Sequence, residues 1–140
     1  MNSKQLDIEP FFRGVIYFKP YTADYLDLSA IDPEVVNKNI ATLDRLAVVL
    51  KKFADYKIAL EGHAVRIYWD QPARGATEEK EVLLPLSQGR ANAIKKALVD
   101  RGVGEARMTT FGYGGTQPVV PHSDLDNRWK NRRVEFILIK

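Results

Sequence analysis

The chain has no cysteine and only two histidines, and both scarcities limit the chemistry it can support. Without cysteine, disulfides, thiolate metal sites and cysteine nucleophiles are excluded. A metal site built on His63 and His122 would need carboxylates from distant loops, and no ligand-spacing motif connects the two histidines. No serine lies in a nucleophile-elbow context, and no glycine-rich turn opens a helix after a strand. We therefore expect no enzyme, no cofactor and no metal.

Long apolar runs and a strong excess of one charge are also missing. No segment approaches the roughly 18 apolar residues of a membrane span, and the N-terminus lacks the apolar core of a signal peptide. The 21 basic and 18 acidic residues leave a net charge of only +3. The run 127–133 contains four cations and a tryptophan, but it is one short patch in a nearly neutral domain. We expect neither a membrane span in this chain nor a nucleic-acid partner.

What is present is an ordinary globular composition. The 140 residues are 45% hydrophobic and 28% charged, which suits one domain with a core of its own. We place that domain at 11–140, behind a polar leader at 1–10. No repeat or low-complexity linker divides the chain.

Hydrophobic periodicity predicts the first three elements. The segment FFRGVIYF (11–18) is rich in aromatic and β-branched residues and predicts a strand. Asp32 and Pro33 are the N-cap and first residue of a helix that should run to about Phe53, with apolar residues three and four apart on one face. Alternation then predicts a strand over 57–65.

The second half of the chain predicts one more helix and two strands. Ser87 can cap a helix that Gly102 closes. Strands should follow at 107–113 and 134–139. This order predicts an α/β fold, a two-layer βαβαβ(β) sandwich with two main helices packed on one face of a mixed sheet. Function is expected in the long loops, which are 19–31, 66–86 and 114–130.

Two residues on these elements could bind a ligand. We expect Arg90 one turn into the second helix, where an arginine opposes the helix dipole and needs another reason to be there. A planar guanidinium that holds a carboxylate with two hydrogen bonds is such a reason. His63 lies at a strand end, where a histidine is more often a structural hydrogen-bonding residue than a base.

Several segments together resemble the C-terminal peptidoglycan-associated domain of outer-membrane protein A, the OmpA-like family, over roughly residues 14–140. The resemblance implies a periplasmic domain, within a fragment of an exported protein, that binds the peptide stem of the cell wall without catalysis, most often through diaminopimelate. It is carried by IYF (16–18), LDRLAVVLKKF (43–53), IALEGH (58–63), LSQGRANAIKKAL (86–98), FGYGGTQPV (111–119) and NRRVEF (131–136).

The resemblance also implies a clamp for a zwitterion. The family's strand-end motif reads like Gly-His-Thr-Asp, and its aspartate takes the ligand ammonium while the arginine of a Leu-Ser-x-x-Arg-Ala motif takes the carboxylate. Arg90 and His63 match, but Ala64 and Val65 stand in place of the threonine and aspartate. Lys19 stands where the family usually has an acidic, aromatic loop, and would repel an ammonium. The clamp has therefore lost its anionic side.

The remaining candidates lie near the ends of two loops. Segment 66–86 is longer than the family's compact loop, so it can supply a new carboxylate, for which Asp70 is nearest, cover the pocket, or stay solvated. The resemblance implies that Asn131 and Arg133 support the fold and the pocket floor. Two functions remain open. One is binding of the peptidoglycan stem, weakened, altered or lost. The other is a non-binding structural or protein-interaction module, which contacts other domains of a larger envelope protein through 66–86.

Overall fold

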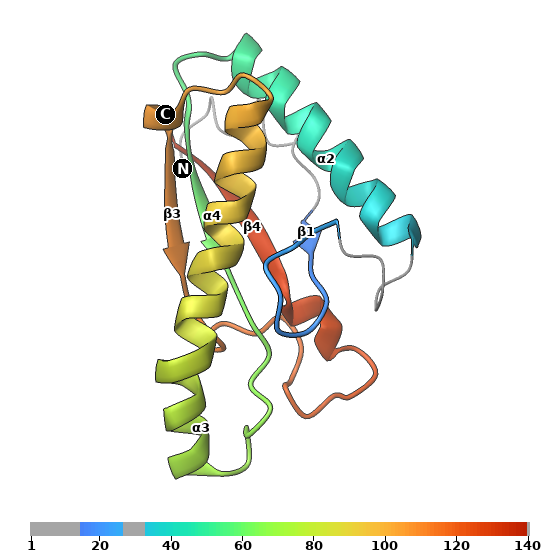
Figure 1. The fold of residues 1–140 in the computed structure, drawn as a ribbon, viewed down its shortest axis with the longest axis vertical. Coiled ribbons are helices and arrows are strands. Elements are labelled where there is room, and N and C mark those ends of the chain that lie inside the picture. The colour runs from blue at the N-terminus through green and yellow to red at the C-terminus, as the bar shows by residue number, and fades with distance from the viewer. Residues whose placement is uncertain (1–14, 27–32, 140) are drawn as a thin grey trace.

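A computed structural model describes residues 15–26 and 33–139 of the chain (Figure 1). Expectations for 1–14 and for Asp32, including the polar leader and the helix cap, lie outside these residues. No helix in the described ranges is long and apolar enough to cross a membrane. The elements, in chain order, are β1 (Ile16–Tyr17), α2 (Pro33–Lys52), β2 (Lys57–Gly62), α3 (Pro72–Glu78), the π-helical turn η2 (Glu79–Leu83), α4 (Leu84–Asp100), the 3-10 turn η3 (Glu105–Arg107), β3 (Met108–Gly112), the 3-10 turn η4 (Arg128–Asn131) and β4 (Arg133–Ile139).

The four strands form one mixed sheet in the order β1-β4-β2-β3. Strands β2 and β3 are parallel, while β4 runs antiparallel to both β1 and β2. Helices α2 and α4 pack against this sheet and share one hydrophobic core with it (Figure 1). The predicted two-layer α/β sandwich with two main helices is therefore confirmed.

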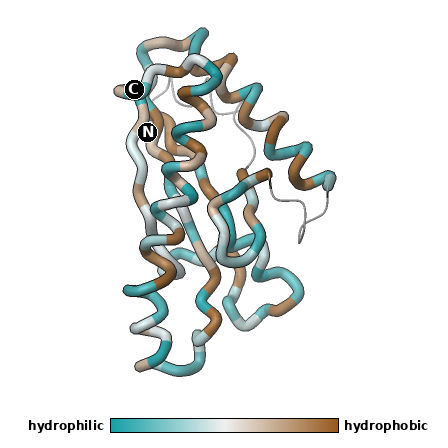
Figure 2. Tube along the Cα trace, viewed as in Figure 1, coloured by the Kyte–Doolittle hydropathy of each residue, from teal (hydrophilic) through white to brown (hydrophobic). Residues whose placement is uncertain are grey.

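Sequence periodicity explains how the two layers meet. In β2, Ile58 and Leu60 are buried while Ala59 and Glu61 alternate with them, as expected for a strand with one face on the core. Apolar and polar residues also alternate along α2, which buries Leu43, Leu46 and Leu50 among others (Figure 2). These side chains fill the space between the layers.

Two glycines let α4 approach the sheet closely. A Cβ atom on Gly62 would lie 1.9 Å from the main-chain oxygen of Ser87, and one on Gly112 would lie 2.5 Å from the main-chain nitrogen of Gln88. Real Cβ contacts are essentially never this short. Ser87 also accepts a hydrogen bond at its Oγ from the Gly114 N–H, at 2.8 Å. The glycine pair therefore fixes where the helix crosses the strands.

The prediction for 66–86 was wrong, because most of that segment is helical. Residues 72–100 form one continuous helix, made of α3, η2 and α4, so Ser87 lies inside it and is not its cap. Pro85 would normally break a regular helix, since proline lacks an N–H and clashes with the preceding turn. The wide η2 turn, in which the Leu84 N–H donates to the Glu79 carbonyl, lies immediately before Pro85 and accommodates it.

The helix ends where the sequence predicted. Gly102 has φ of +92°, and its N–H donates to the Val99 carbonyl while that of Val103 donates to Leu98. This pair of bonds is the glycine-dependent C-terminal cap called the Schellman motif. The strand expected over 57–65 is shorter and ends at Gly62, because the chain then leaves the sheet and the Ala64 N–H donates to Gly114 instead.

Candidate functional site

Arg90 is completely buried and is held by main-chain oxygens. Its Nε donates to the carbonyl of Thr22 at 2.9 Å, its Nη1 to His63 at 2.8 Å and its Nη2 to Lys19 at 3.0 Å. The guanidinium also lies 5.2 Å from the centre of the Phe18 ring. Arg90 thus ties α4 to the end of β2 and to both sides of the turn at Pro20 and Tyr21.

This environment differs from the one that the sequence suggested. Arg90 lies in the interior of the 72–100 helix, so the argument from the helix dipole does not apply. Burial, followed by repulsion from Arg132, lowers the pKa of Arg90 to about 9. At neutral pH the side chain therefore remains a buried cation whose hydrogen bonds go to uncharged carbonyls.

Arg90 forms the floor of a hollow of about 350 Å³ that we call the arginine hollow. Val65 lies beside it, so the two positions of the family's clamp line the same space. The side chain at the position of the missing aspartate offers only methyl groups there. The hollow is lined by Pro20, Tyr21, Val65, Ile67, Leu83, Leu86, Arg90, Arg128 and Arg132.

Three of these lining residues are arginines and none is an acid. Arg128 and Arg132 are half-buried, and the Nε of Arg132 donates to the Phe18 carbonyl at 2.8 Å. Burial, and then repulsion from Arg128, lowers the pKa of Arg132. The charges that act on Arg90 and Arg132 are thus those of other arginines. The lining of the hollow therefore carries three positive charges and no carboxylate to offset them.

Segment 66–86 supplies apolar side chains, and no carboxylate, to the lining of this hollow. Leu83 and Leu86 line it, whereas the exposed Asp70 does not. Two acids of the segment, Glu78 and Glu79, hold loops instead. Glu78 is buried and accepts from the N–H groups of Ile67 and Tyr68, both at 3.1 Å. Segment 66–86 therefore contributes apolar side chains to the lining of the hollow, and the new carboxylate considered for Asp70 is not among them.

Glu79, beside it, accepts from the Arg66 guanidinium and from the Gly115 N–H, both at 2.9 Å. His122 joins the same loop junction, since it accepts from the Arg66 N–H at Nδ1 and its Nε2 lies 2.8 Å from the Gly115 carbonyl. The Nε2–H tautomer satisfies both contacts. These bonds fix the loops at 66–68 and 114–116 relative to each other.

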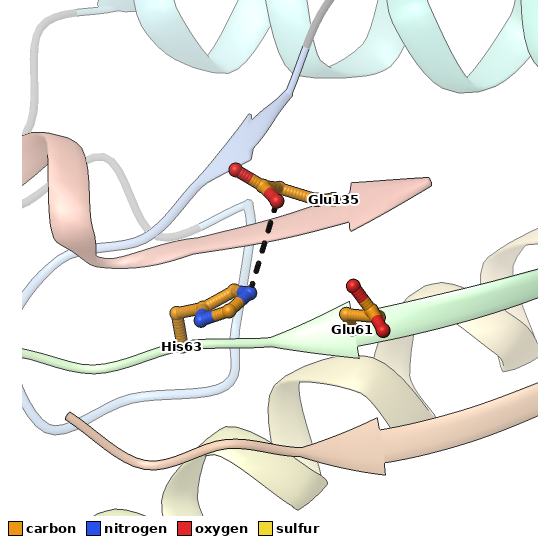
Figure 3. Close-up of side chains that lie close together, drawn as sticks. All are labelled: Glu61, His63 and Glu135. Carbon is orange, nitrogen blue, oxygen red and sulfur yellow. Dashed lines mark ion pairs between the residues drawn. The ribbon is translucent and has the colours of Figure 1, made fainter. Parts of the chain in front are cut away.

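The His63 ring does not line the arginine hollow and lies in a group with Glu61 and Glu135 (Figure 3). It stacks on Tyr113, with 5.4 Å between ring centres and 7° between planes. Neither ring nitrogen has a hydrogen-bond partner among the described residues. Burial, reinforced by Arg133 and opposed by Glu135, lowers the pKa of His63 to about 4. The ring is therefore neutral at pH 7, and its 3.9 Å approach to Glu135 is not an ion pair there.

One nitrogen and two carboxylate oxygens of this group lie within 4.8 Å of one another, a spacing at which ligands can surround a metal ion. The carboxylates already have partners, however. Glu135 accepts from the Arg133 Nε at 2.7 Å, and Glu61 accepts from the Tyr113 hydroxyl at 3.0 Å. A metal ion would have to displace or tolerate the Arg133 cation. The arrangement is better explained as two separate pairs, Glu135 with Arg133 and Glu61 with Tyr113, on either side of a neutral histidine ring.

We predict that His63 makes the chain less stable in mild acid. Its folded pKa of about 4 lies below the usual histidine value of 6.5, so between these pH values the unfolded chain binds a proton that the folded chain does not. The free energy of unfolding should therefore fall as the pH drops from about 6.5 to about 4, by up to about 3 kcal/mol. Urea unfolding of the wild type and His63→Gln across this range measures it. A difference between the two proteins that does not change with pH would contradict the prediction.

The other predicted site residues hold loops in place. Asn131 is buried, accepts from the Val119 and Val120 N–H groups and donates to the Val120 carbonyl. Arg133 is buried and donates to the Gln117 carbonyl at 3.0 Å as well as to Glu135. The Lys19 carbonyl accepts from Arg90, and Ala64 is buried behind the hollow. None of these four residues lines the arginine hollow.

Arg128 and Arg132 were not singled out from the sequence, although their run was noticed for its charge. The signal lies in their spacing. Four residues apart across η4, both reach the hollow, while the intervening Asn131 and the following Arg133 turn toward the 117–120 loop. Counting charges along 127–133 cannot tell which residues line the hollow and which hold the 117–120 loop.

A family model and several known proteins similar to this chain all indicate the same family. The model of the OmpA family matches residues 32–132. A peptidoglycan-associated lipoprotein of Rhizobium meliloti (strain 1021) is 40% identical over 98 residues, which cover 70% of this chain and 50% of that protein. The peptidoglycan-binding protein ArfA of Mycobacterium bovis is 32% identical over 96 residues, which cover 69% of this chain and 26% of that protein.

Among solved structures, the peptidoglycan-associated lipoprotein from Burkholderia pseudomallei superimposes with a TM-score of 0.69 at 26% identity, covering 89% of each chain. The chain spans about half the length of the first curated relatives that it matches. The match of the family model covers most of the chain, and the fold agrees with that of a solved relative. The chain therefore belongs to the OmpA family.

Proposed function

We propose that this chain is a non-catalytic peptidoglycan-binding domain of the periplasmic side of the cell envelope, and that the arginine hollow receives part of the wall peptide stem. The observation that carries the proposal is the position of the hollow. Val65 and Arg90, the positions that the family resemblance assigns to the wall ligand, line one space of about 350 Å³. Relatives named as peptidoglycan-associated or peptidoglycan-binding proteins support it.

The binding role differs from the clamp that the resemblance implies. Because Arg90 is covered and donates to three carbonyls, its charge acts through the floor of the hollow. Direct contacts to a ligand carboxylate fall to Arg128 and Arg132, whose half-buried side chains line the space. An arginine can hold a carboxylate with two parallel hydrogen bonds, which suits it to this task.

Co-sedimentation with insoluble peptidoglycan tests the proposal. We expect the wild-type chain in the pellet, and we expect Arg128→Gln to weaken its retention about ten-fold, as for the loss of one charge-assisted hydrogen bond. Lys130→Gln is the matched control, because it removes one charge from the same turn but Lys130 does not line the hollow. Wild type that stays in the supernatant would contradict the proposal. It would favour the alternative, a protein-interaction module using the exposed Trp69 before α3.

A further inference from the structure

The charge in the arginine hollow limits which ligands it can accept. Its lining contains the guanidinium groups of Arg90, Arg128 and Arg132 and no carboxylate. Some arginines elsewhere in the described chain have acidic partners, such as Asp44 for Arg101 at 2.8 Å and Glu79 for Arg66 at 2.9 Å. The three arginines of the hollow have none among the described residues. Such a concentration of unpaired cations favours an anionic ligand.

The same feature disfavours a zwitterion. A free ammonium placed beside Val65 would lie in a space lined by three cations and would meet methyl groups where an acid could have paired with it. Like charges brought together in a partly buried space repel strongly, since water screens them poorly. A ligand with one carboxylate and one free ammonium is therefore attracted to the hollow at its carboxylate and repelled at its ammonium.

The rest of the lining suits an uncharged, partly apolar body. Val65, Ile67, Leu83 and Leu86 form one wall. At the rim, Tyr21 is 63% exposed, and its backbone has φ of +57°, in the left-handed region that few side chains adopt. Arg90 holds this turn from both sides through the carbonyls of Lys19 and Thr22. A ring held in this way can pack over an aliphatic or amide-linked chain that enters the hollow.

We propose that the arginine hollow binds a carboxylate whose carrier has no free ammonium, and that it therefore prefers wall stems in which the side-chain amine is acylated, as in a cross-link between two stems. Acylation turns the ammonium into a neutral amide, which removes the repulsion and leaves the carboxylate for Arg128 and Arg132. This inference rests on the proposed function and names its ligand class.

The test compares two peptides that differ only in this charge. Stem tripeptides that contain diaminopimelate and are blocked at the N-terminus, with the side-chain amine either free or acetylated, are titrated into the 140-residue chain and followed by NMR. We expect the affinity of the chain for the acetylated peptide to be at least about ten-fold higher than for the peptide with the free amine. Arg128→Gln should lose about ten-fold in affinity for the acetylated peptide, because one carboxylate contact is gone. The Arg128 guanidinium makes no hydrogen bond or ion pair within the described residues, so this variant should remain folded.

A second variant pair tests the position of the missing acid. Val65→Asp should reverse the preference, so that the free amine binds more tightly, whereas Val65→Asn, of the same size but uncharged, should keep the preference for the acetylated peptide. Equal or tighter binding of the free amine by the wild type would overturn the inference, even if the chain still sediments with peptidoglycan. Failure of both peptides to bind would also overturn it. Failure to sediment with peptidoglycan would, in addition, contradict the proposed function.

Discussion

Replacing Arg90 with methionine should lower the free energy of unfolding by about 3–5 kcal/mol, because three main-chain carbonyls would lose a hydrogen-bond donor at once. Methionine fills similar space but donates no hydrogen bond, so the carbonyls of Lys19, Thr22 and His63 would lose their donor. Each buried acceptor left without a partner costs about 1–3 kcal/mol. Relief of the repulsion between Arg90 and Arg132 offsets part of this loss. Urea unfolding at pH 7 measures the change.

Lys96→Met provides the control for this experiment. Lys96 lies on the same helix, is 78% exposed and pairs with Asp100 four residues later. An exposed pair of this kind contributes about 0.3–0.5 kcal/mol. If Arg90→Met changed stability no more than Lys96→Met does, the three carbonyl contacts would have no structural importance, and Arg90 would have to be explained by its ligand.

Replacing Gly62 with alanine should destabilise the fold by about 3 kcal/mol or more, at the upper end of what overpacking costs. The added methyl group would lie 1.9 Å from the Ser87 carbonyl oxygen, which belongs to the helix backbone and cannot move aside as a side chain can. The helix would have to shift away from β2, and the 2.8 Å bond from the Gly114 N–H to Ser87 Oγ would lengthen with it. Thermal and urea unfolding both report this change.

Gly89 supplies the matched control, since it lies in the same helix two residues after Ser87. A Cβ atom there meets only the Ala23 side chain, at 3.8 Å, an ordinary contact distance. Gly89→Ala should therefore be neutral or stabilising by up to about 1 kcal/mol, because alanine is the better helix former. A loss below about 1 kcal/mol for Gly62→Ala would mean that the layers can separate at little cost.

The layers of the fold could be predicted because their signals are local. Alternation at 58–62 identified β2, the spacing of apolar residues at 36–50 identified α2, and Gly102 marked the end of α4. The helical nature of 72–86 could not be predicted in this way. Pro85 and a run of charged residues argue against a helix locally. The wide η2 turn is stabilised by hydrogen bonds from loops at 66–68 and 114–115 to Glu78 and Glu79, which a local pattern does not reveal.

The candidate site was predicted only in part. The family resemblance correctly brought the positions of Val65 and Arg90 to one place. The burial of Arg90 depends on the path of residues 19–22, about 70 residues away in sequence, and no local pattern carries that information. Asn131 and Arg133 likewise bind a loop that the sequence gives no reason to place beside them. Long-range contacts thus decided which charged residues face a ligand and which hold the chain.

The η2 turn gives this helix one residue more than a regular helix would need between its two halves. Each residue of a regular α-helix turns the direction of its side chains by about 100°, since about 3.6 residues complete a turn. A turn closed by a hydrogen bond between residues five apart, here from the Leu84 N–H to the Glu79 carbonyl, takes in an extra residue. Removing one residue between Lys80 and Leu83 would let the turn close to a regular one, so α3 would keep nearly its present rotation relative to α4. Glu78 and Glu79 would then still point toward the main-chain N–H groups and the guanidinium that they hold. The angular phase of the loop-holding half therefore tolerates a one-residue deletion at η2, whereas a one-residue insertion there would rotate α3 by about 100°.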